Sequence, residues 1–248
     1  MSKVRIDSYL VEQGYFESRE KAKRNIMAGL VLINDEKVAK PGDTYRLSDI
    51  KEIRLKGNEC PYASRAGFKL EKAIKVFKVD MKDKIMLDVG SSTGGFTDCA
   101  LIFGVKKVFA LDVGTNQLIY RLRSDKRVEV YEKTNFRTIE KDFFKEKFDI
   151  ITMDVSFIST ILLMNNVVAN LKKDGKFIML IKPQFEAGRE VVRTSKGIIK
   201  DEKVFKDVKV SIVKAATEKG LKCLNIIDSP IKGKNGNQEF LAIFKLDN

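Results

Sequence analysis

From residue 65 onward, short apolar runs alternate with amphipathic stretches, and this alternation constrains the fold more than any other feature. The apolar runs fit buried strands and the stretches between them fit helices. Such an order predicts a doubly wound, mostly parallel α/β sheet with helices on both faces. We expect helices over 65–78 and near 96–104, 116–124, 159–171 and 201–219, and strands over 84–89, 107–112, 128–132, 148–154 and 176–182. The last two runs, 221–228 and 240–246, are joined by a loop that permits an antiparallel pair.

The first part of the chain has a different pattern, in which two short helices precede short strands. Helical spacing over 6–13 ends at Gly14, and Ser18 is the expected N-cap of a second helix that stops at Gly29. The string "LVLIN" then fits a strand, and "KPGD" fits a turn. We therefore predict a small α+β domain over 1–57, a linker over 58–62 and a larger domain over 63–248.

Charge and composition narrow the classes of partner and of chemistry. The 248 residues carry a net charge of +13, which favours a polyanionic partner, although lysine-rich surfaces can also serve solubility alone. No apolar run approaches the ~20 residues of a membrane span, and no secretory signal is visible, so we expect a cytoplasmic protein without a membrane partner. Histidine is absent and the three cysteines form no CxxC pair, so we expect no metal site. Acid–base chemistry must then use Lys, Asp, Glu, Tyr or Cys.

A glycine-bearing loop, "LDVGSSTGGFTDCA" at residues 87–100, follows the first expected strand of the large domain. Its spacing, G-x-x-x-G-G after Asp88, departs from the G-x-G-x-x-G of dinucleotide-binding loops and matches that of S-adenosylmethionine enzymes. Asp112 ends the next strand, where a carboxylate can accept hydrogen bonds from both ribose hydroxyls of either ligand, and Asn135 is a candidate for the adenine edge. A dinucleotide site, or plain helix and turn capping by the two aspartates, remains the alternative. The predicted donor site comprises Asp88, Gly90, Ser91, Gly94, Gly95, Phe96, Asp112 and Asn135.

The strand expected over 148–154 runs into "MDVSF", and the residues at this strand end help to decide which chemical group accepts the methyl group. It lacks the Asx-Pro-Pro-aromatic motif of amino-group methyltransferases, and no Pro-Cys nucleophile of the pyrimidine-carbon enzymes occurs in the chain. A hydroxyl acceptor remains, and its methylation needs a base that is held close and is neutral when it acts. Without histidine, a lysine is the natural base if burial or nearby positive charge favours the neutral amine. Lys182, which ends an apolar strand before Pro183, is the candidate; a surface lysine past a strand end is the alternative.

Sequence strings over almost the whole chain resemble one protein family. The string "RIDSYL…SREKAKRNIMAGLVLINDEKVAKPGD" resembles the S4-like RNA-binding domain, with Asp35 in place of the usual glycine. The strings "YASRAGFKLEKA", "DVGSSTGGFTDC", "ALDVGTNQL", "MDVSFIS", "IKPQFEAG" and "SPIKGKNGNQE" are similar to those of the TlyA, or haemolysin A-like, family of rRNA methyltransferases. Ser91 stands where that family often has alanine. The large domain of this family is FtsJ-like.

The resemblance implies both a fold and a reaction. The fold is a Rossmann-like class I methyltransferase domain with a seven-stranded, mostly parallel sheet whose last strand is antiparallel. The reaction is S-adenosylmethionine-dependent 2′-O-methylation of cytidine in bacterial ribosomal RNA. We expect ribosomal subunits as the partner, no binding to DNA, and a monomeric protein. Lys69, Asp154, Lys182 and Glu239 resemble the catalytic tetrad of FtsJ-like enzymes. In that family pattern Lys182 is the base, Lys69 and Asp154 position the ribose and tune Lys182, and Glu239 orders the lysines.

Basic residues in both domains are candidates for RNA contacts, and a solvated, charged surface is the alternative for each. The loop after Lys182 is expected to be long, and we hypothesise that its basic residues clamp RNA phosphates. The predicted RNA-binding set is Arg5, Arg19, Lys23, Arg65, Arg189, Arg193 and Lys196. Two other functions stay open: a membrane-active haemolysin, suggested by the older family name alone, and a catalytically silent RNA-binding protein on a methyltransferase scaffold.

Overall fold

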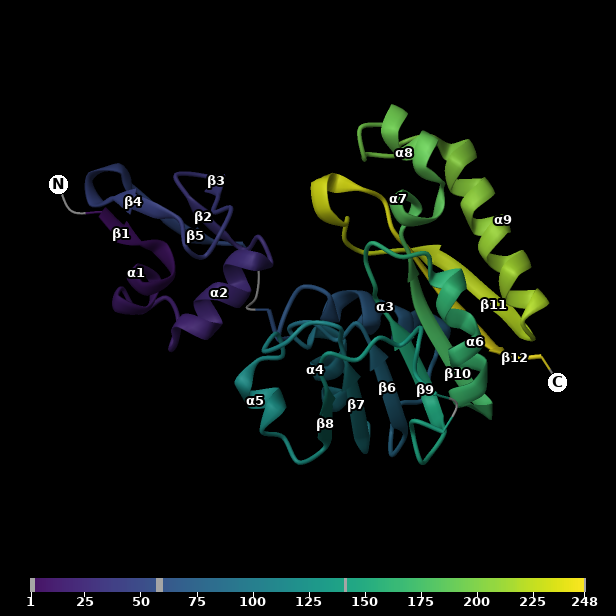
Figure 1. The fold of residues 1–248 in the computed structure, drawn as a ribbon. Coiled ribbons are helices and arrows are strands. Elements are labelled where there is room, and N and C mark those ends of the chain that lie inside the picture. The colour runs from purple at the N-terminus through teal and green to yellow at the C-terminus, as the bar shows by residue number, and fades with distance from the viewer. Residues whose placement is uncertain (1–2, 57–59, 141, 248) are drawn as a thin grey trace. The chain divides into compact units, whose positions relative to one another are not determined.

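The computed structural model describes residues 3–56, 60–140 and 142–247, and the side chains of Arg189 and Lys234 lie outside that description. The chain divides into two compact units, Met1–Ala66 and Gly67–Asn248 (Figure 1). The predicted linker over 58–62 falls partly on residues 57–59, which lie outside the described residues. The exact domain boundaries therefore stay a prediction.

The N-terminal unit is a small α+β structure with one apolar core. Side chains of both helices and of the central strand fill this core, among them Ile6, Leu10, Ile26 and Val31. Ser18 caps the second helix as predicted, because its Oγ accepts a hydrogen bond of 3.2 Å from the Lys21 N–H. The strands form a two-stranded sheet, β1-β4, and a three-stranded sheet, β3-β2-β5. The elements are β1 Lys3–Arg5, α1 Ile6–Glu12, α2 Arg19–Met27, β2 Val31–Ile33, β3 Glu36–Lys37, β4 Thr44–Arg46, η1 Leu47–Asp49 and β5 Ile53–Leu55.

The C-terminal unit is built on the predicted seven-stranded sheet, in the order β11-β12-β10-β9-β6-β7-β8. Neighbouring strands from β10 to β8 pair in parallel, whereas β12 is antiparallel to both β10 and β11. The mostly parallel sheet with an antiparallel last strand is therefore confirmed. Its elements are α3 Gly67–Phe77, β6 Ile85–Val89, α4 Gly95–Ile102, β7 Lys107–Leu111, α5 Tyr120–Arg123, β8 Val128–Tyr131, β9 Phe148–Met153, η2 Thr160–Leu163, α6 Met164–Asn170, β10 Leu171–Ile181, α7 Pro183–Glu186, α8 Arg189–Thr194, α9 Glu202–Glu218, β11 Leu221–Asp228, η3 Lys234–Gly236 and β12 Phe240–Leu246.

Helices cover both faces of this sheet, and the strand alternation decides which residues face which helices. On one face, Leu87 of β6 joins a core that includes Val167 of α6 and Ile212 of α9. The next residue of β6, Asp88, points to the opposite face, where Thr97 of α4 donates a hydrogen bond of 2.7 Å to it. The sheet is therefore buried on both sides, as its near-continuous apolar runs require.

Three segments of this unit differ from the sequence-based expectation. The strand expected over 176–182 starts earlier, since β10 runs from Leu171 to Ile181. The helix expected near 116–124 is only the four residues of α5, because its N-cap Ile119 is extended, with φ −63° and ψ 148°. Asn116 also adopts a left-handed φ of 54°, which a continuous helix excludes. The expected long loop after Lys182 contains two short helices, α7 and α8. Among the residues that the structure describes, no helix is both long enough and apolar enough to cross a membrane.

Candidate functional site

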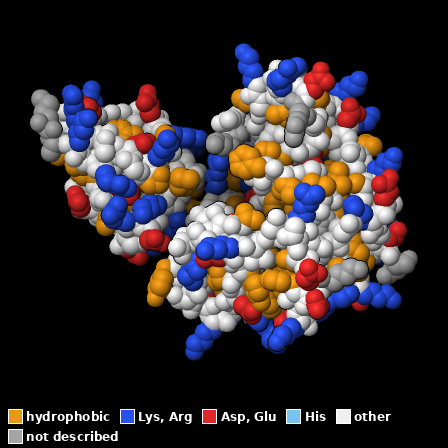
Figure 2. All heavy atoms as spheres, in the orientation of Figure 1, with side chains coloured by type: hydrophobic (Ala, Val, Ile, Leu, Met, Phe, Trp, Pro, Cys, Tyr) orange, Lys and Arg blue, Asp and Glu red, His pale blue; other side chains and the backbone are white. Residues whose placement is uncertain are grey.

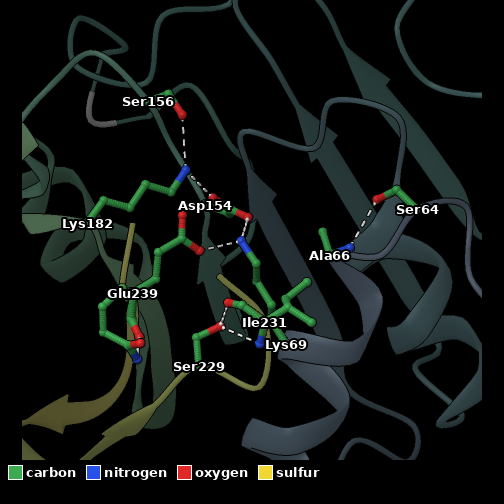
Figure 3. A network of polar contacts seen from close by, with 10 residues as sticks. Ser64, Ala66, Lys69, Asp154, Ser156, Lys182, Ser229, Ile231 and Glu239 are labelled. Atoms are coloured by element: carbon green, nitrogen blue, oxygen red, sulfur yellow. Dashed lines mark hydrogen bonds and ion pairs between the residues drawn. The ribbon is translucent and has the colours of Figure 1, made fainter. Parts of the chain in front are cut away.

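The four predicted catalytic side chains meet at the carboxyl edge of the parallel strands (Figure 3). Asp154 directly follows β9 and Lys182 directly follows β10, so parallel pairing brings them to the same edge. Glu239 directly precedes β12, which runs antiparallel and therefore starts at that edge. Lys69 reaches the cluster from α3. Strand polarity thus explains why residues far apart in the sequence converge.

Ion pairs connect these four side chains into one chain of contacts. The Nζ of Lys182 lies 2.5 Å from Oδ1 of Asp154. The other carboxylate oxygen, Oδ2, lies 3.5 Å from the Nζ of Lys69, which donates a hydrogen bond of 2.7 Å to Oε2 of Glu239. Two cationic and two anionic groups alternate, so the cluster is electrically balanced when all four are ionised.

Burial makes this balance necessary, because an isolated charge away from water is costly. Lys69, Lys182 and Glu239 are each less than a tenth exposed. Burial by itself would raise the pKa of Asp154, but the nearby charges of Lys69 and Lys182 outweigh it and hold that pKa below its usual value. The carboxylate of Asp154 is therefore ionised at neutral pH and fixes both lysines.

Two polar residues that the sequence did not indicate support this cluster. The Oγ of Ser156 accepts a hydrogen bond of 3.0 Å from the Nζ of Lys182. Glu186 of α7 accepts three hydrogen bonds of 2.6–2.8 Å, from the Ser159 hydroxyl and from the backbone and hydroxyl of Thr160. Glu186 thus ties the segment after Lys182 to the loop after Asp154, although no local sequence pattern reports such a contact.

A cavity of about 530 Å³, the donor pocket, opens beside this cluster. Its wall includes Gly90 after β6, Asp112 after β7, Asn135 after β8 and both Asp154 and Ser156 after β9. Apolar side chains complete it: Val89, Leu111, Val113, Phe136, Val155, Phe157, Ile158 and Leu163. The pocket therefore joins three predicted donor-site residues to one residue of the catalytic cluster.

Glycine is required at position 90 for two reasons. Its φ is +82°, and a Cβ would lie only 2.7 Å from the backbone oxygen of Asp154. Asp112 organises the rest of the turn, because its two carboxylate oxygens accept hydrogen bonds of 2.8 Å from the backbone N–H groups of Ser92 and Gly114. A compact main-chain cradle with a carboxylate beside it fits the amino-acid and ribose parts of S-adenosylmethionine.

The other predicted donor residues are buried and do not line the pocket. Asp88 is fully buried and accepts hydrogen bonds from the Thr97 and Thr152 hydroxyls. Burial raises the pKa of Asp88 to about 6, against the opposing effect of these two hydrogen bonds. The remaining predicted donor residues that do not line the pocket are Ser91, Gly94, Gly95 and Phe96, all buried in the glycine turn and the start of α4. A direct donor contact by these five residues stays a prediction.

The predicted RNA-binding residues in the N-terminal unit fall into a paired and an exposed group. Arg5 and Arg19 are half exposed and both pair at 3.0 Å with buried Asp7, whose pKa they hold far below its usual value. Lys23 and Arg65 are exposed. Lysine and arginine side chains are spread over the visible face of this unit (Figure 2).

In the C-terminal unit, the predicted RNA-binding residues belong to one segment around α8. Arg193 and Lys196 are exposed, and Arg193 lines a second pocket next to the donor pocket. The side chain of Arg189 lies outside the described residues. Asn237 fixes the end of this segment, since it accepts a hydrogen bond from the Ile199 N–H and donates one to the Gly197 carbonyl.

This fold and site define a Rossmann-like class I methyltransferase domain that follows a small S4-like unit. A model of the FtsJ-like methyltransferase family matches residues 62–246, and a model of the S4 domain matches residues 4–51. The chain belongs to the FtsJ-like methyltransferase family and, within it, to the TlyA, haemolysin A-like group. This membership favours the methyltransferase interpretation over a membrane-active haemolysin.

Three relatives illustrate the extent of the similarity. YqxC of Bacillus subtilis, named as a candidate rRNA methyltransferase, is 49% identical, with 96% of this chain and 84% of the relative covered. The 16S/23S rRNA (cytidine-2′-O)-methyltransferase TlyA of Mycobacterium tuberculosis is 33% identical, with coverages of 96% and 88%. A solved structure of a hemolysin-like protein from Streptococcus thermophilus has a TM-score of 0.78 at 43% identity and covers 100% of this chain and 90% of that one.

Proposed function

We propose that this protein transfers the methyl group of S-adenosylmethionine to the ribose 2′-hydroxyl of a cytidine in ribosomal RNA. The observation that carries this proposal is the buried, alternating cluster of Lys69, Asp154, Lys182 and Glu239, which reaches the wall of the donor pocket through Asp154. The substrate class rests on the S4 domain and on the named activity of the mycobacterial relative.

The donor pocket supplies the residues that would hold S-adenosylmethionine. Gly90 lets the ligand approach the main chain, Asp112 would accept hydrogen bonds from the ribose hydroxyls, and Asn135 would contact the adenine. When bound, the cofactor supplies a methyl group on a positively charged sulfur. Asp154 and Ser156 line this pocket and both contact the Nζ of Lys182, so Lys182 lies beside the pocket that would hold the cofactor.

The tetrad would then act on the acceptor. Lys182 is cationic in the resting cluster, so it would first release a proton to solvent. Its neutral amine would then accept the proton of the 2′-hydroxyl as the ribose oxygen bonds to the methyl carbon and the carbon–sulfur bond breaks. Asp154 and Ser156 hold the Nζ of Lys182 in place by contacts of 2.5 and 3.0 Å. Glu239 compensates the charge of Lys69, so that Lys69 can bind Asp154 or the ribose without leaving a buried charge unpaired. Positioning of the reacting atoms supplies much of the rate increase in such a displacement.

The proposal is tested by incubating the purified protein with labelled S-adenosylmethionine and ribosomal subunits, then mapping the label by mass spectrometry. We expect a 2′-O-methyl group on an rRNA cytidine. Lys182→Ala should slow transfer by about 100- to 10,000-fold, the usual contribution of a general base, and should leave cofactor binding in equilibrium dialysis unchanged. Lys173→Ala, an exposed lysine on the same strand, is the matched control and should be fully active.

Two results would contradict the proposal. Label in base atoms would exclude ribose methylation, and full activity of Lys182→Ala would exclude Lys182 as the base. If the wild-type protein binds rRNA but transfers no label, the catalytically silent RNA-binding alternative is correct.

A further inference from the structure

The hydroxyl of Ser156 contacts the proposed base from outside the four-residue tetrad. Its Oγ accepts a hydrogen bond of 3.0 Å from the Nζ of Lys182, and Oδ1 of Asp154 lies 2.5 Å from the same nitrogen (Figure 3). In the described part of the chain, this nitrogen has no other hydrogen bond or ion pair. Lys182 therefore has two acceptors, one charged and one neutral.

The number of acceptors matters because a lysine nitrogen has three tetrahedral positions besides its bond to carbon. The ammonium form carries an N–H donor at each of them and has no lone pair. Asp154 and Ser156 take two of the three donors, and their acceptor oxygens stabilise these two protons. The amine should therefore lose the third proton when it becomes neutral, and its lone pair then lies at the third position.

Asp154 alone would not fix this direction. With a single acceptor, the neutral amine could rotate about its Cε–Nζ bond and place the lone pair at either of the two other positions. The contact to Ser156 holds the second N–H, so only one orientation satisfies both acceptors. Because the side chain of Lys182 is only 10% exposed, a substrate hydroxyl can approach it from few directions, and the direction of the lone pair becomes important.

The loop that carries Ser156 is fixed at both ends, so its hydroxyl has a defined position. At the start of the loop, the Asp154 N–H donates a hydrogen bond of 3.1 Å to the Val89 carbonyl of β6. At its end, Glu186 accepts three hydrogen bonds of 2.6–2.8 Å from residues 159 and 160. Glu186 belongs to α7, the helix that begins directly after the proposed base. The loop and the base are therefore held by the same short helix.

We propose that Ser156 is a positioning residue for methyl transfer: together with Asp154 it directs the lone pair of the neutral Lys182 amine toward the 2′-hydroxyl of the bound nucleotide. This inference rests on the proposed ribose methylation. The proton of the 2′-hydroxyl moves to the lone pair, while the other two N–H groups stay bonded to Asp154 and Ser156. Since Ser156 also lines the donor pocket, it links the orientation of the base to the position of the methyl donor.

A hydroxyl group can donate as well as accept, and the opposite arrangement makes the opposite prediction. If the Ser156 hydroxyl donated to the neutral amine, it would occupy the lone pair and block the base. Removal of the hydroxyl would then accelerate methyl transfer. In the resting ammonium form Ser156 can only accept, because that form has no lone pair.

The test measures methyl transfer to ribosomal subunits at saturating S-adenosylmethionine and separates the maximal rate from the KM for the subunits. Ser156→Ala should lower the maximal rate by about 10- to 100-fold, the effect of a misplaced reacting group, and should leave the KM unchanged. Ser156→Thr and Ser156→Val add side chains of the same shape, but only threonine keeps the hydroxyl acceptor. Ser156→Thr should therefore be about tenfold faster than Ser156→Val. Ser211→Ala, which changes an exposed serine of α9, is the control and should match the wild type.

The outcomes separate this inference from the proposed function. A wild-type or faster rate in Ser156→Ala, an effect confined to the KM, or equal rates for Ser156→Thr and Ser156→Val would overturn the role of Ser156. Each of these results leaves ribose methylation in place as long as Lys182→Ala is slow. Methylation of a base atom by the wild type, or no methylation at all, would overturn the proposed function and this inference with it.

Discussion

Replacing Gly233 by alanine should displace the carboxylate of Glu239 without changing any side chain of the tetrad. Gly233 lies in the loop between β11 and β12, and a Cβ at this position would lie 2.1 Å from Oε1 and 2.8 Å from Cδ of Glu239. Because Cβ atoms essentially never approach other heavy atoms within 3.0 Å, the carboxylate has to move by at least about 0.9 Å. Glu239 is only 3% exposed and bonds Lys69 at 2.7 Å, so this movement disturbs a buried ion pair.

The magnitude follows from this geometry. If the contact lengthens by about 1 Å, the attraction between the two charges weakens by about 1.7 kcal/mol at an effective dielectric constant near 20. A lost hydrogen bond between charged groups costs about 1.5–3 kcal/mol. If that free energy is lost from the transition state, methyl transfer slows by about 10- to 100-fold. Cofactor affinity should not change, because neither Gly233 nor Glu239 lines the donor pocket.

The assay is single-turnover methyl transfer to ribosomal subunits, with cofactor affinity measured separately by equilibrium dialysis. Gly236→Ala is the matched control, because it strains the same loop through a φ of +83° but places no Cβ within 4 Å of another group. The control should transfer at a rate close to that of the wild type. A wild-type rate of methyl transfer in Gly233→Ala would refute the role assigned to the position of Glu239. An equal loss of rate in Gly236→Ala would refute it as well.

Three further predictions concern stability, cofactor binding and RNA binding. Burial raises the pKa of Asp88 to about 6, so the folded protein binds the proton of this carboxyl group more tightly than the unfolded chain does. The free energy of unfolding is therefore highest below pH ~4 and declines by about 3 kcal/mol as the pH rises through 6. In urea unfolding between pH 4 and 7, Asp88→Asn should flatten this decline; an unchanged slope would disprove its origin. Gly90→Ala forces a Cβ against the Asp154 backbone and should weaken S-adenosylmethionine binding by at least about tenfold in calorimetry, whereas unchanged affinity would contradict the cradle. Arg193→Gln combined with Lys196→Gln should lower the salt slope of rRNA affinity by about 1.4–1.8, the loss of two phosphate contacts; a wild-type slope would exclude this segment from the RNA interface.

The resemblance to FtsJ-like enzymes predicts the four residues of the tetrad, and strand direction explains why three of them converge. The positions of Asp154 and Lys182 follow from two parallel strands that end at one edge, and Glu239 joins them because the last strand is reversed. The N-cap at Ser18 is equally local, since it needs only one side chain and the backbone three residues later. Such features depend on period, polarity and short-range hydrogen bonding, which a sequence records directly.

The remaining features depend on contacts that no local pattern reports. Glu186 accepts hydrogen bonds from residues 26 and 27 positions earlier in the chain. The side-chain oxygen of Gln184 is buried without a hydrogen-bond donor among the described residues, and a sequence does not show such an absence. The extended backbone at Ile119 and the left-handed backbone at Asn116 shorten α5, although the residues around them are compatible with a helix. The three-residue strands β1, β4 and β5 are too short to show a reliable alternation.

The close approach of Gly90 to the carbonyl of Asp154 has a consequence for how this protein can diverge. The glycine turn after β6 and the end of β9 meet mainly through main-chain atoms, and Cγ1 of Val155 also lies close to Gly90. The distance between the two halves of the site is therefore set mainly by the backbone. Mutations in either pocket wall can alter affinity or base preference while the distance between the two halves of the site stays constant. New RNA targets can therefore arise without a change in the geometry of the methyl-transfer site.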